Sequence, residues 1–268
     1  PALLDWGAAN DSAMRLTSGG TVLLRLFDRI RHLFNDNSKS GSRKNIAYHY
    51  DLGNEFYKKW LDPSMTYSSA VFEREDEALE DAQTRKYRQL AEALEITPGM
   101  DVLEVGCGWG GFAEVAARDF GANVTAITIS QEQFDFATKR IEKAGLTDQV
   151  KVVFCDYRDI EGEFDRIASI EMIEAVGLKH LPTYFKVLRE RLKPKGLAGI
   201  QAITIEESRF ETYRKSVDFI QKYIFPGGFL PAVSYFHQVA GQAGLKVKRE
   251  QFFGKSYATT LARWRDRF

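Results

Sequence analysis

The sequence has few of the residues that build disulfide scaffolds and metal sites. It contains two cysteines, Cys107 and Cys155, and four histidines, and no pair among them has the spacing of zinc ligands. A disulfide-rich scaffold is therefore excluded, and a reducing compartment is expected. We expect no bound metal.

An excess of charge and long apolar runs are also missing. The 37 basic and 37 acidic side chains give a net charge of zero, whereas proteins that bind nucleic acid usually carry a basic excess. No apolar run approaches the length of a membrane span, and no signal-peptide pattern is visible. We therefore expect a cytoplasmic protein without a nucleic-acid partner.

The N-terminal part differs in pattern from the rest. Residues 22–34 (VLLRLFDRIRHLF) predict an amphipathic helix with basic residues beside its apolar face. Such a helix either packs on its own domain or lies on an anionic membrane. Residues 35–45 are polar and predict a linker. We therefore divide the chain into an N-terminal helical segment with its linker, 1–44, and a main domain, 45–268.

The main domain predicts strands that alternate with helices. Its expected strands cover 101–105, 123–129, 149–156, 164–170 and 197–205, and its expected helices cover 77–96, 131–143 and 181–192. This alternation is typical of a doubly wound, mostly parallel α/β sheet. Ligands of such sheets bind beyond the carboxyl ends of the strands.

A glycine-rich turn, GCGWGG at 106–111, follows the first expected strand. Its spacing alone also fits a dinucleotide site, but such a site needs an acid after the second strand, and none is there. With Glu104 the turn becomes E-x-G-x-G-x-G, the methyltransferase version. The predicted ligand is then S-adenosylmethionine, with Gln133 at the ribose and Asp156 near the adenine.

Seven segments in order resemble the cyclopropane-fatty-acyl-phospholipid synthase family. They are 48–73 (YHYDLGNEFYKKWLDPSMTYSSAVFE), 102–113 (VLEVGCGWGGFA), 128–133 (TISQEQ), 156–159 (DYRD), 165–177 (DRIASIEMIEAVG), 223–231 (YIFPGGFLP) and 256–268 (SYATTLARWRDRF). The resemblance implies a class I methyltransferase fold, Rossmann-like, with a seven-stranded sheet. It also implies a bound bicarbonate that acts as general base, and residues 1–34 as the remnant of a lipid-binding region.

Three of the family's motifs are altered here. YSCA reads Tyr67-Ser68-Ser69-Ala70, EHVG keeps only Glu174 of its two polar residues, and LHTI has Gln201 in place of its histidine. The YxxTL motif, led by Tyr257, is intact. These departures resemble a plant-like branch of the family.

The resemblance assigns two sets of site residues. Bicarbonate is expected to accept hydrogen bonds from the Gln201 amide, the Tyr257 hydroxyl and the Ile203 backbone N–H, and to donate to Glu174. With Ser69, these make up the predicted catalytic set. The predicted cofactor-binding set is Tyr67, Ser68, Glu104, Gly106, Gly108, Gly110, Thr128, Gln133, Asp156 and Tyr157. Aromatic faces that could stabilise a carbocation are those of Tyr67, Phe72, Phe225 and Tyr257.

The predicted reaction is methyl transfer to the double bond of an unsaturated phospholipid, followed by closure of a cyclopropane ring. The enzyme would work at the inner face of a membrane, and a homodimer is left open. Two alternatives in the same fold remain: a methylene- or methyl-branched product, and a non-catalytic lipid-binding relative. A dinucleotide oxidoreductase is disfavoured by the missing acid.

Overall fold

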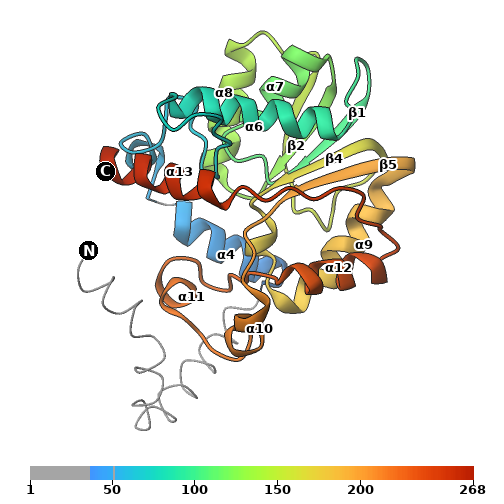
Figure 1. Ribbon diagram of the computed structural model, residues 1–268. Helices are drawn as coiled ribbons and strands as arrows, with labels where there is room; N and C mark the ends of the chain where they lie inside the picture. The colour runs from blue at the N-terminus through green and yellow to red at the C-terminus, as the bar shows by residue number, and fades with distance from the viewer. Residues whose placement is uncertain (1–36, 51) are drawn as a thin grey trace.

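A computed structural model describes residues 37–50 and 52–268 of the chain (Figure 1). The helix predicted over 22–34 lies outside the described residues. The family resemblance covers the part that is described, and the predicted site lies within it.

The centre of the molecule is a sheet in which every neighbouring pair of strands is parallel. Its strands are β1 (Asp101–Val105), β2 (Asn123–Thr128), β3 (Val150–Phe154), β4 (Phe164–Ile170) and β5 (Leu192–Gln201), in the order β3-β2-β1-β4-β5. The parallel, doubly wound prediction is confirmed. Seven strands were expected, and the described residues form five: residues 245–253, beyond the last long α/β unit, pair with no strand.

Helices cover both faces of this sheet, and a separate buried core lies on each face. Around β1 to β3 lie α6 (Leu79–Ala93), α7 (Gly111–Phe120) and α8 (Gln131–Lys143), and α9 (Leu181–Arg191) and α12 (Val233–Gln242) pack together beside β5. The remaining helices are α4 (Lys39–Tyr50), α5 (Asn54–Tyr57), α10 (Glu207–Tyr213), α11 (Phe219–Tyr223) and α13 (Gly254–Arg267), with short 3₁₀ turns at Ile173–Ala175 and Leu178–His180.

The predicted linker is wrong over residues 39–45, because these residues begin helix α4. Residues distant in the sequence hold Asn37, just before the start of α4. Arg158 donates to the Asn37 carbonyl at 2.8 Å, and Asn37 donates to the Gly227 carbonyl at 2.8 Å. Local polarity predicts a linker, and these long-range bonds override it. The predicted boundary at 44/45 therefore falls inside a helix.

Strand β5 begins and ends earlier than predicted. Leu192 pairs with Phe164, and after an irregularity Leu197 pairs with Arg166. The ladder stops where Ile170, the last residue of β4, lies opposite Gln201. Ala202 to Ile205 then leave the sheet because β4 offers no further partner. The carboxyl ends of β4 and β5 consequently lie side by side.

Candidate active site

The glycine-rich turn after β1 forms an open cradle. Gly106, Gly108 and Gly110 have φ values of 78°, 52° and 83°, which favour glycine. A side chain at Gly106 would collide with Met172, at 2.6 Å, whereas a Cβ at Gly108 would have nothing within 4 Å. The backbone at Gly108 can thus be approached closely by a ligand, so the turn fits S-adenosylmethionine.

Glu104 lies beneath this turn rather than in the open site. It is buried, and its carboxyl group accepts a hydrogen bond from the Ala113 backbone in the first turn of α7. Burial raises its pKa to about 8. Its direct contacts therefore join β1 to α7 and shape the cradle, and direct contact with the cofactor stays a prediction.

The end of β2 holds Gln133 in place. Ser130 caps α8, as its position before the helix predicts, because its hydroxyl accepts from the Gln133 N–H at 3.3 Å. The Thr128 hydroxyl donates to Gln133 Oε1 at 2.9 Å. Both bonds leave the amide nitrogen of Gln133 without a hydrogen-bond partner in the described part of the chain. Its predicted role at a ribose is compatible with this arrangement.

At the end of β3, the residues predicted to contact the adenine already make contacts within the protein. Arg158 donates to both carboxylate oxygens of Asp156, at 2.8 and 2.7 Å. Tyr157 packs edge-on against Tyr184, with ring centroids 5.6 Å apart. Asp156 thus anchors the segment before α4 through Arg158, and its adenine contact stays a prediction, as does that of Tyr157.

Beyond β4, Glu174 reaches the segment that follows β5. Its Oε1 accepts from the Ile203 N–H at 2.6 Å, and its Oε2 is inaccessible to solvent and has no partner among residues 37–50 and 52–268. Burial, and then the charge of Glu171, raise the Glu174 pKa to about 8. A carboxyl group poised in this way can accept a proton near neutral pH.

Gln201 is held by a residue that the sequence reasoning did not single out. Its Nε2 donates to Glu171 Oε1 at 2.8 Å and to the Ser69 carbonyl at 3.2 Å. Glu171 Oε1 also accepts from the Ser69 N–H at 2.8 Å. The available signal was position, since Glu171 directly follows β4 where β5 ends with Gln201.

Lys86 of α6 was also missed. It is buried and donates to the Ser68 hydroxyl at 2.6 Å, while Gln83 donates to the Ser68 carbonyl at 2.8 Å. Burial lowers the Lys86 pKa to about 7, opposed by the charge of Glu171. Its place on the predicted apolar face of the helix, in line with Ala82 and Leu90, was the signal.

The four predicted aromatic residues are only partly brought together. Tyr67, Phe72 and Tyr257 pack against one buried aromatic cluster that includes Tyr57 and Trp264. Tyr67 lies 5.5 Å from Trp264 between ring centroids. Burial, and then the charge of Glu171, raise the Tyr257 pKa far above its usual value, so its hydroxyl stays protonated. Phe225 lies apart, just beyond α11, and is not in this cluster.

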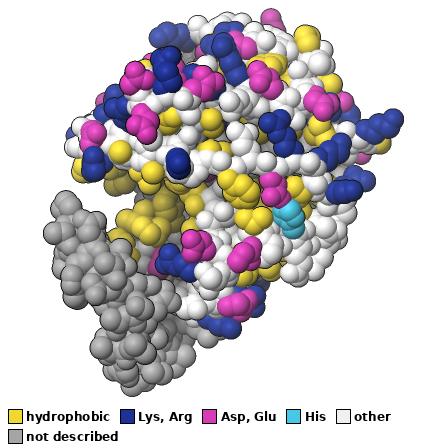
Figure 2. Space-filling view, in the orientation of Figure 1, with side chains coloured by type: hydrophobic (Ala, Val, Ile, Leu, Met, Phe, Trp, Pro, Cys, Tyr) yellow, Lys and Arg dark blue, Asp and Glu magenta, His cyan; other side chains and the backbone are white. Residues whose placement is uncertain are grey.

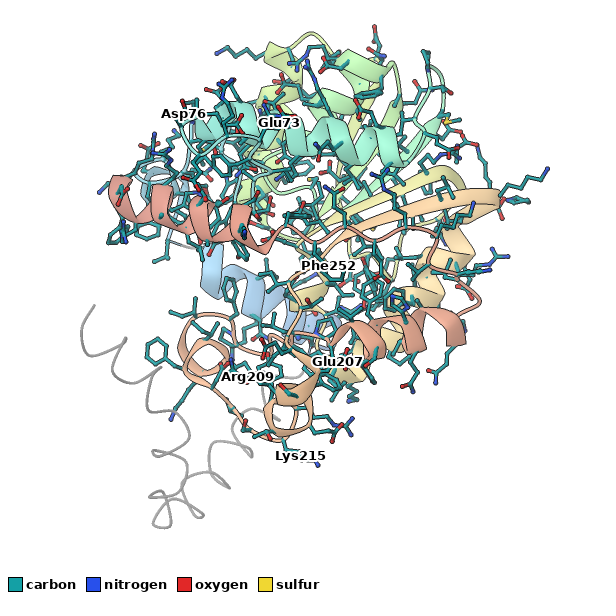
Figure 3. All side chains as sticks on the ribbon, viewed as in Figure 1. Glu73, Asp76, Glu207, Arg209, Lys215 and Phe252 are labelled. Atoms are coloured by element: carbon teal, nitrogen blue, oxygen red, sulfur yellow. The ribbon has the colours of Figure 1, made fainter. Side chains whose placement is uncertain are left out.

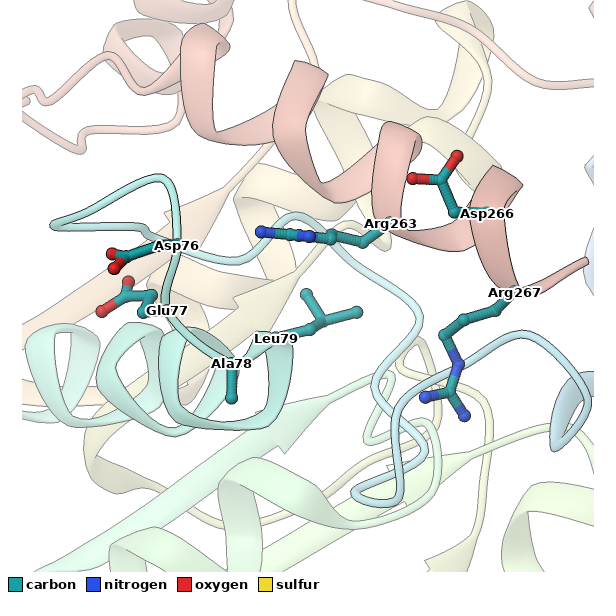
Figure 4. A pocket seen from close by; sticks show the side chains of 7 residues that line it. All are labelled: Asp76, Glu77, Ala78, Leu79, Arg263, Asp266 and Arg267. Carbon is teal, nitrogen blue, oxygen red and sulfur yellow. The ribbon is translucent and has the colours of Figure 1, made fainter.

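An open cavity of about 340 Å³ lies elsewhere, between the start of α6 and the end of α13 (Figure 4). It is lined by Asp76, Glu77, Ala78, Leu79, Arg263, Asp266 and Arg267. In Figure 3, Asp76 and Glu73, which precede α6 in the chain, both lie in the upper part of the view. None of the predicted site residues lines this cavity, and its charged rim faces solvent.

Bicarbonate does not fit the donors that the sequence predicts for it. The Ile203 N–H donates to Glu174, and both amide hydrogens of Gln201 have acceptors within the protein. Of the expected donors, only the Tyr257 hydroxyl remains. The Ser69 hydroxyl donates to the Ala70 carbonyl at 3.0 Å and offers no replacement.

Relatives of known name share this sequence and fold. The chain is 41% identical over 242 residues to the tuberculostearic acid methyltransferase UfaA1 of Mycobacterium tuberculosis, covering 87% of this chain and 56% of that protein. It is 40% identical over 237 residues to the cyclopropane-fatty-acyl-phospholipid synthase of Escherichia coli, covering 88% of this chain and 59% of that protein. The chain thus spans little more than half the length of these relatives.

A solved structure of mycolic acid cyclopropane synthase CmaA1, complexed with SAH and CTAB, superposes with a TM-score of 0.78 at 30% identity. The match covers 84% of this chain and 82% of that one. Residues 37–268 match the family described as mycolic acid cyclopropane synthetase. With the glycine cradle and the ordered motifs, this confirms the resemblance: the chain belongs to the mycolic acid cyclopropane synthetase family.

Proposed function

We propose that the chain transfers the methyl group of S-adenosylmethionine to the cis double bond of an unsaturated phospholipid acyl chain and closes a cyclopropane ring. The observation that carries this proposal is the meeting of three features at the carboxyl ends of the strands. They are the open cradle at Gly108, the partnerless oxygen of Glu174 and the aromatic cluster around Tyr67 and Tyr257.

The chemistry assigns a task to each feature. Bound S-adenosylmethionine supplies an electrophilic methyl group, whose bond to sulfur breaks as a bond to the alkene carbon forms and a carbocation develops on the neighbouring carbon. The Gly108 backbone allows the cofactor to come close. The faces of Tyr67 and Tyr257 stabilise the cation and exclude water, which would otherwise trap it.

An apolar substrate suits the surface near the site. Figure 2 shows hydrophobic side chains gathered in a hollow between α13 and the α10–α11 segment. No helix in the described residues is long and apolar enough to cross a membrane. We therefore propose that the acyl chain is taken from the inner, cytoplasmic face of a membrane to which the protein binds peripherally.

Lipid analysis tests this proposal. The full-length chain is expressed in a host that makes cis-unsaturated phospholipids, and its acyl chains are compared with those from a host carrying the empty vector. We expect acyl chains enlarged by one CH₂ that resist hydrogenation, as a cyclopropane does. An unchanged lipid profile, with S-adenosylmethionine bound and no turnover on any unsaturated lipid, would favour the non-catalytic relative instead.

A methylene-branched product is the second candidate. The engaged donors of Gln201 and Ile203 favour it, because a site that does not hold bicarbonate need not direct the departing proton as ring closure requires. One similar protein is named a tuberculostearic acid methyltransferase rather than a cyclopropane synthase. Hydrogenation before mass analysis separates the two products, since a methylene group is reduced and a ring is not.

A further inference from the structure

The Gln201 side chain can be oriented in one way only. Its Nε2 lies within hydrogen-bond distance of Glu171 Oε1 and of the Ser69 carbonyl oxygen. Rotating the amide by half a turn would place its oxygen against these two acceptors, which repel it. Burial raises the pKa of Glu171, opposed by the hydrogen bond from the Ser69 N–H and by the charge of Lys86. The Ser69 carbonyl can only accept, so it fixes the orientation of the Gln201 amide whichever form Glu171 takes.

This orientation changes what Gln201 offers to a ligand. Both of its N–H groups are used, and only the amide oxygen is left, with no hydrogen-bond partner in the described ranges. In its ionised form, Glu174 offers Oε2 as a second acceptor without a partner among the described residues. Two such acceptors attract a cation or a proton and repel an anion.

We infer that Glu171 is a positioning residue that turns Gln201 into an acceptor, so that the site works without bicarbonate and Glu174 itself accepts the proton. This inference rests on the proposed methyl transfer. Glu174 Oε2 has no hydrogen-bond partner among the described residues and is left to take the proton, while the Ile203 N–H holds Oε1 at 2.6 Å.

The step balances without a further reactant. After methyl transfer, a C–H bond of the transferred methyl group breaks, its electron pair closes the ring onto the cationic carbon, and the proton goes to Glu174 Oε2. For the methylene product, a hydride first shifts from the methylated carbon to the cationic carbon. The same C–H bond of the methyl group then supplies the pair for the double bond. Release of that proton to solvent restores the carboxylate, and no oxidant or reductant is needed.

Glu171→Gly tests the positioning role. Glu171 has a φ of 47°, which glycine adopts without strain, and the change removes the acceptor that holds Gln201. Glu95→Gly is a matched control, because Glu95 has a φ of 53° and lies exposed at the end of α6. Both variants and Glu174→Gln are compared with the wild-type full-length chain.

Two measurements are made on each protein. Turnover is recorded with S-adenosylmethionine and vesicles of dioleoylphosphatidylglycerol, in carbon-dioxide-depleted buffer with and without added bicarbonate. Binding of ¹³C-labelled bicarbonate to the protein loaded with S-adenosylhomocysteine is followed by ¹³C NMR, which does not depend on activity.

We expect wild type and Glu95→Gly to ignore bicarbonate in both measurements. Glu174→Gln should lose about a hundredfold or more in turnover without rescue by bicarbonate. Glu171→Gly should acquire bicarbonate binding and be accelerated by it. The inference is overturned by bicarbonate binding to wild type, by rescue of Glu174→Gln, or by a Glu171→Gly variant as indifferent as the control. Failure of every protein to methylate lipid would refute the proposed function. The NMR measurement would still show whether each protein binds bicarbonate.

Discussion

At the scale of single residues, the ionisation of Glu174 should govern the pH dependence of the reaction. Its pKa is raised to about 8 by burial and by Glu171, so the proton-accepting carboxylate form grows as the pH rises through that value. We expect kcat/KM to rise with pH through about 8. A bound sulfonium favours the carboxylate, so the rise in kcat should come at lower pH. A flat or falling profile would contradict this assignment.

The rise assigned to Glu174 must be separated from the ionisation of other buried groups. Tyr184, Tyr213 and Tyr257 also face Glu174, but the pKa of each is raised above its ordinary value and lies well above 8. Burial lowers the Lys86 pKa to about 7 and raises the Glu104 pKa to about 8. Recording the same profile for Lys86→Met and for Glu104→Gln distinguishes these groups, because a rise that belongs to Glu174 persists in both variants.

Gly108→Val should abolish cofactor binding, because a side chain would fill the space that the ligand needs. Gly145→Val is the matched control: Gly145 has a φ of 68° and, like Gly108, open space at its Cβ position. Each variant should lose about 1–2 kcal/mol of stability from backbone strain, but only Gly108→Val should fail to bind S-adenosylhomocysteine in calorimetry. Equal affinities would remove the turn from the cofactor site.

The sequence was sufficient to nominate Glu174, Gln201, Ile203 and Tyr257, because these residues stand at positions that match motifs of a known family. It could not predict which of their hydrogen-bonding groups would be free. Gln201 meets Glu171 only after β4 and β5 pair, and Ser69 joins them from a loop more distant in the sequence. Bonds of this kind depend on tertiary packing and have no local pattern.

At the scale of elements, the attachment of α4 to the end of β3 depends on a nearly buried ion pair. The Asp156 side chain is 1% exposed and that of Arg158 is 10% exposed. Arg158→Met should lower the free energy of unfolding by about 3–5 kcal/mol, since it leaves a buried carboxylate unpaired. Lys39→Met, which removes the exposed ion pair between Lys39 of α4 and Asp159 beyond β3, should cost no more than about 1 kcal/mol. Urea denaturation measures the free energy of unfolding of both variants. Similar losses in the two would show that the buried ion pair does not hold α4 to the end of β3.

The same ion pair determines how the free energy of unfolding changes with pH. Burial alone would raise the Asp156 pKa, but the hydrogen bonds from Arg158 hold it below the ordinary value of 3.8. The stabilisation is therefore fully present above that value and is lost as the pH falls through the folded-state pKa. The difference between wild type and Arg158→Met should accordingly shrink in acid.

Elements were predicted best where the pattern is local. Strands β1 and β4 have the predicted bounds, and α8 begins after its predicted cap. The start of α4 and both ends of β5 were not predicted, because Asn37 is ordered by Arg158 and the length of β5 is limited by β4. The number of strands was taken from the family resemblance rather than from a pattern in residues 245–253.

At the scale of the whole molecule, a net charge of zero means that attraction to an anionic membrane must be local. The basic residues in 22–34 are the predicted source. Changing Arg25, Arg29 and Arg31 together to Gln should weaken sedimentation with anionic vesicles, and binding by wild type should fall with added salt. The control changes the exposed residues Lys139, Lys143 and Lys151 to Gln. Binding that is equal on neutral and anionic vesicles would contradict the prediction.

The bond between Glu171 and Gln201 also constrains how such a site can evolve. Replacing either residue alone leaves a half-buried carboxylate or a buried amide without its partner, at a cost of about 1–3 kcal/mol. Lineages should therefore change both positions together, and intermediate sequences should be rare or carry compensating stability. Among descendants of a common ancestor, we expect an acid at 171 to be inherited with the amide at 201. Reconstructed ancestors that carry only one of the two should unfold more readily than those with both or with neither.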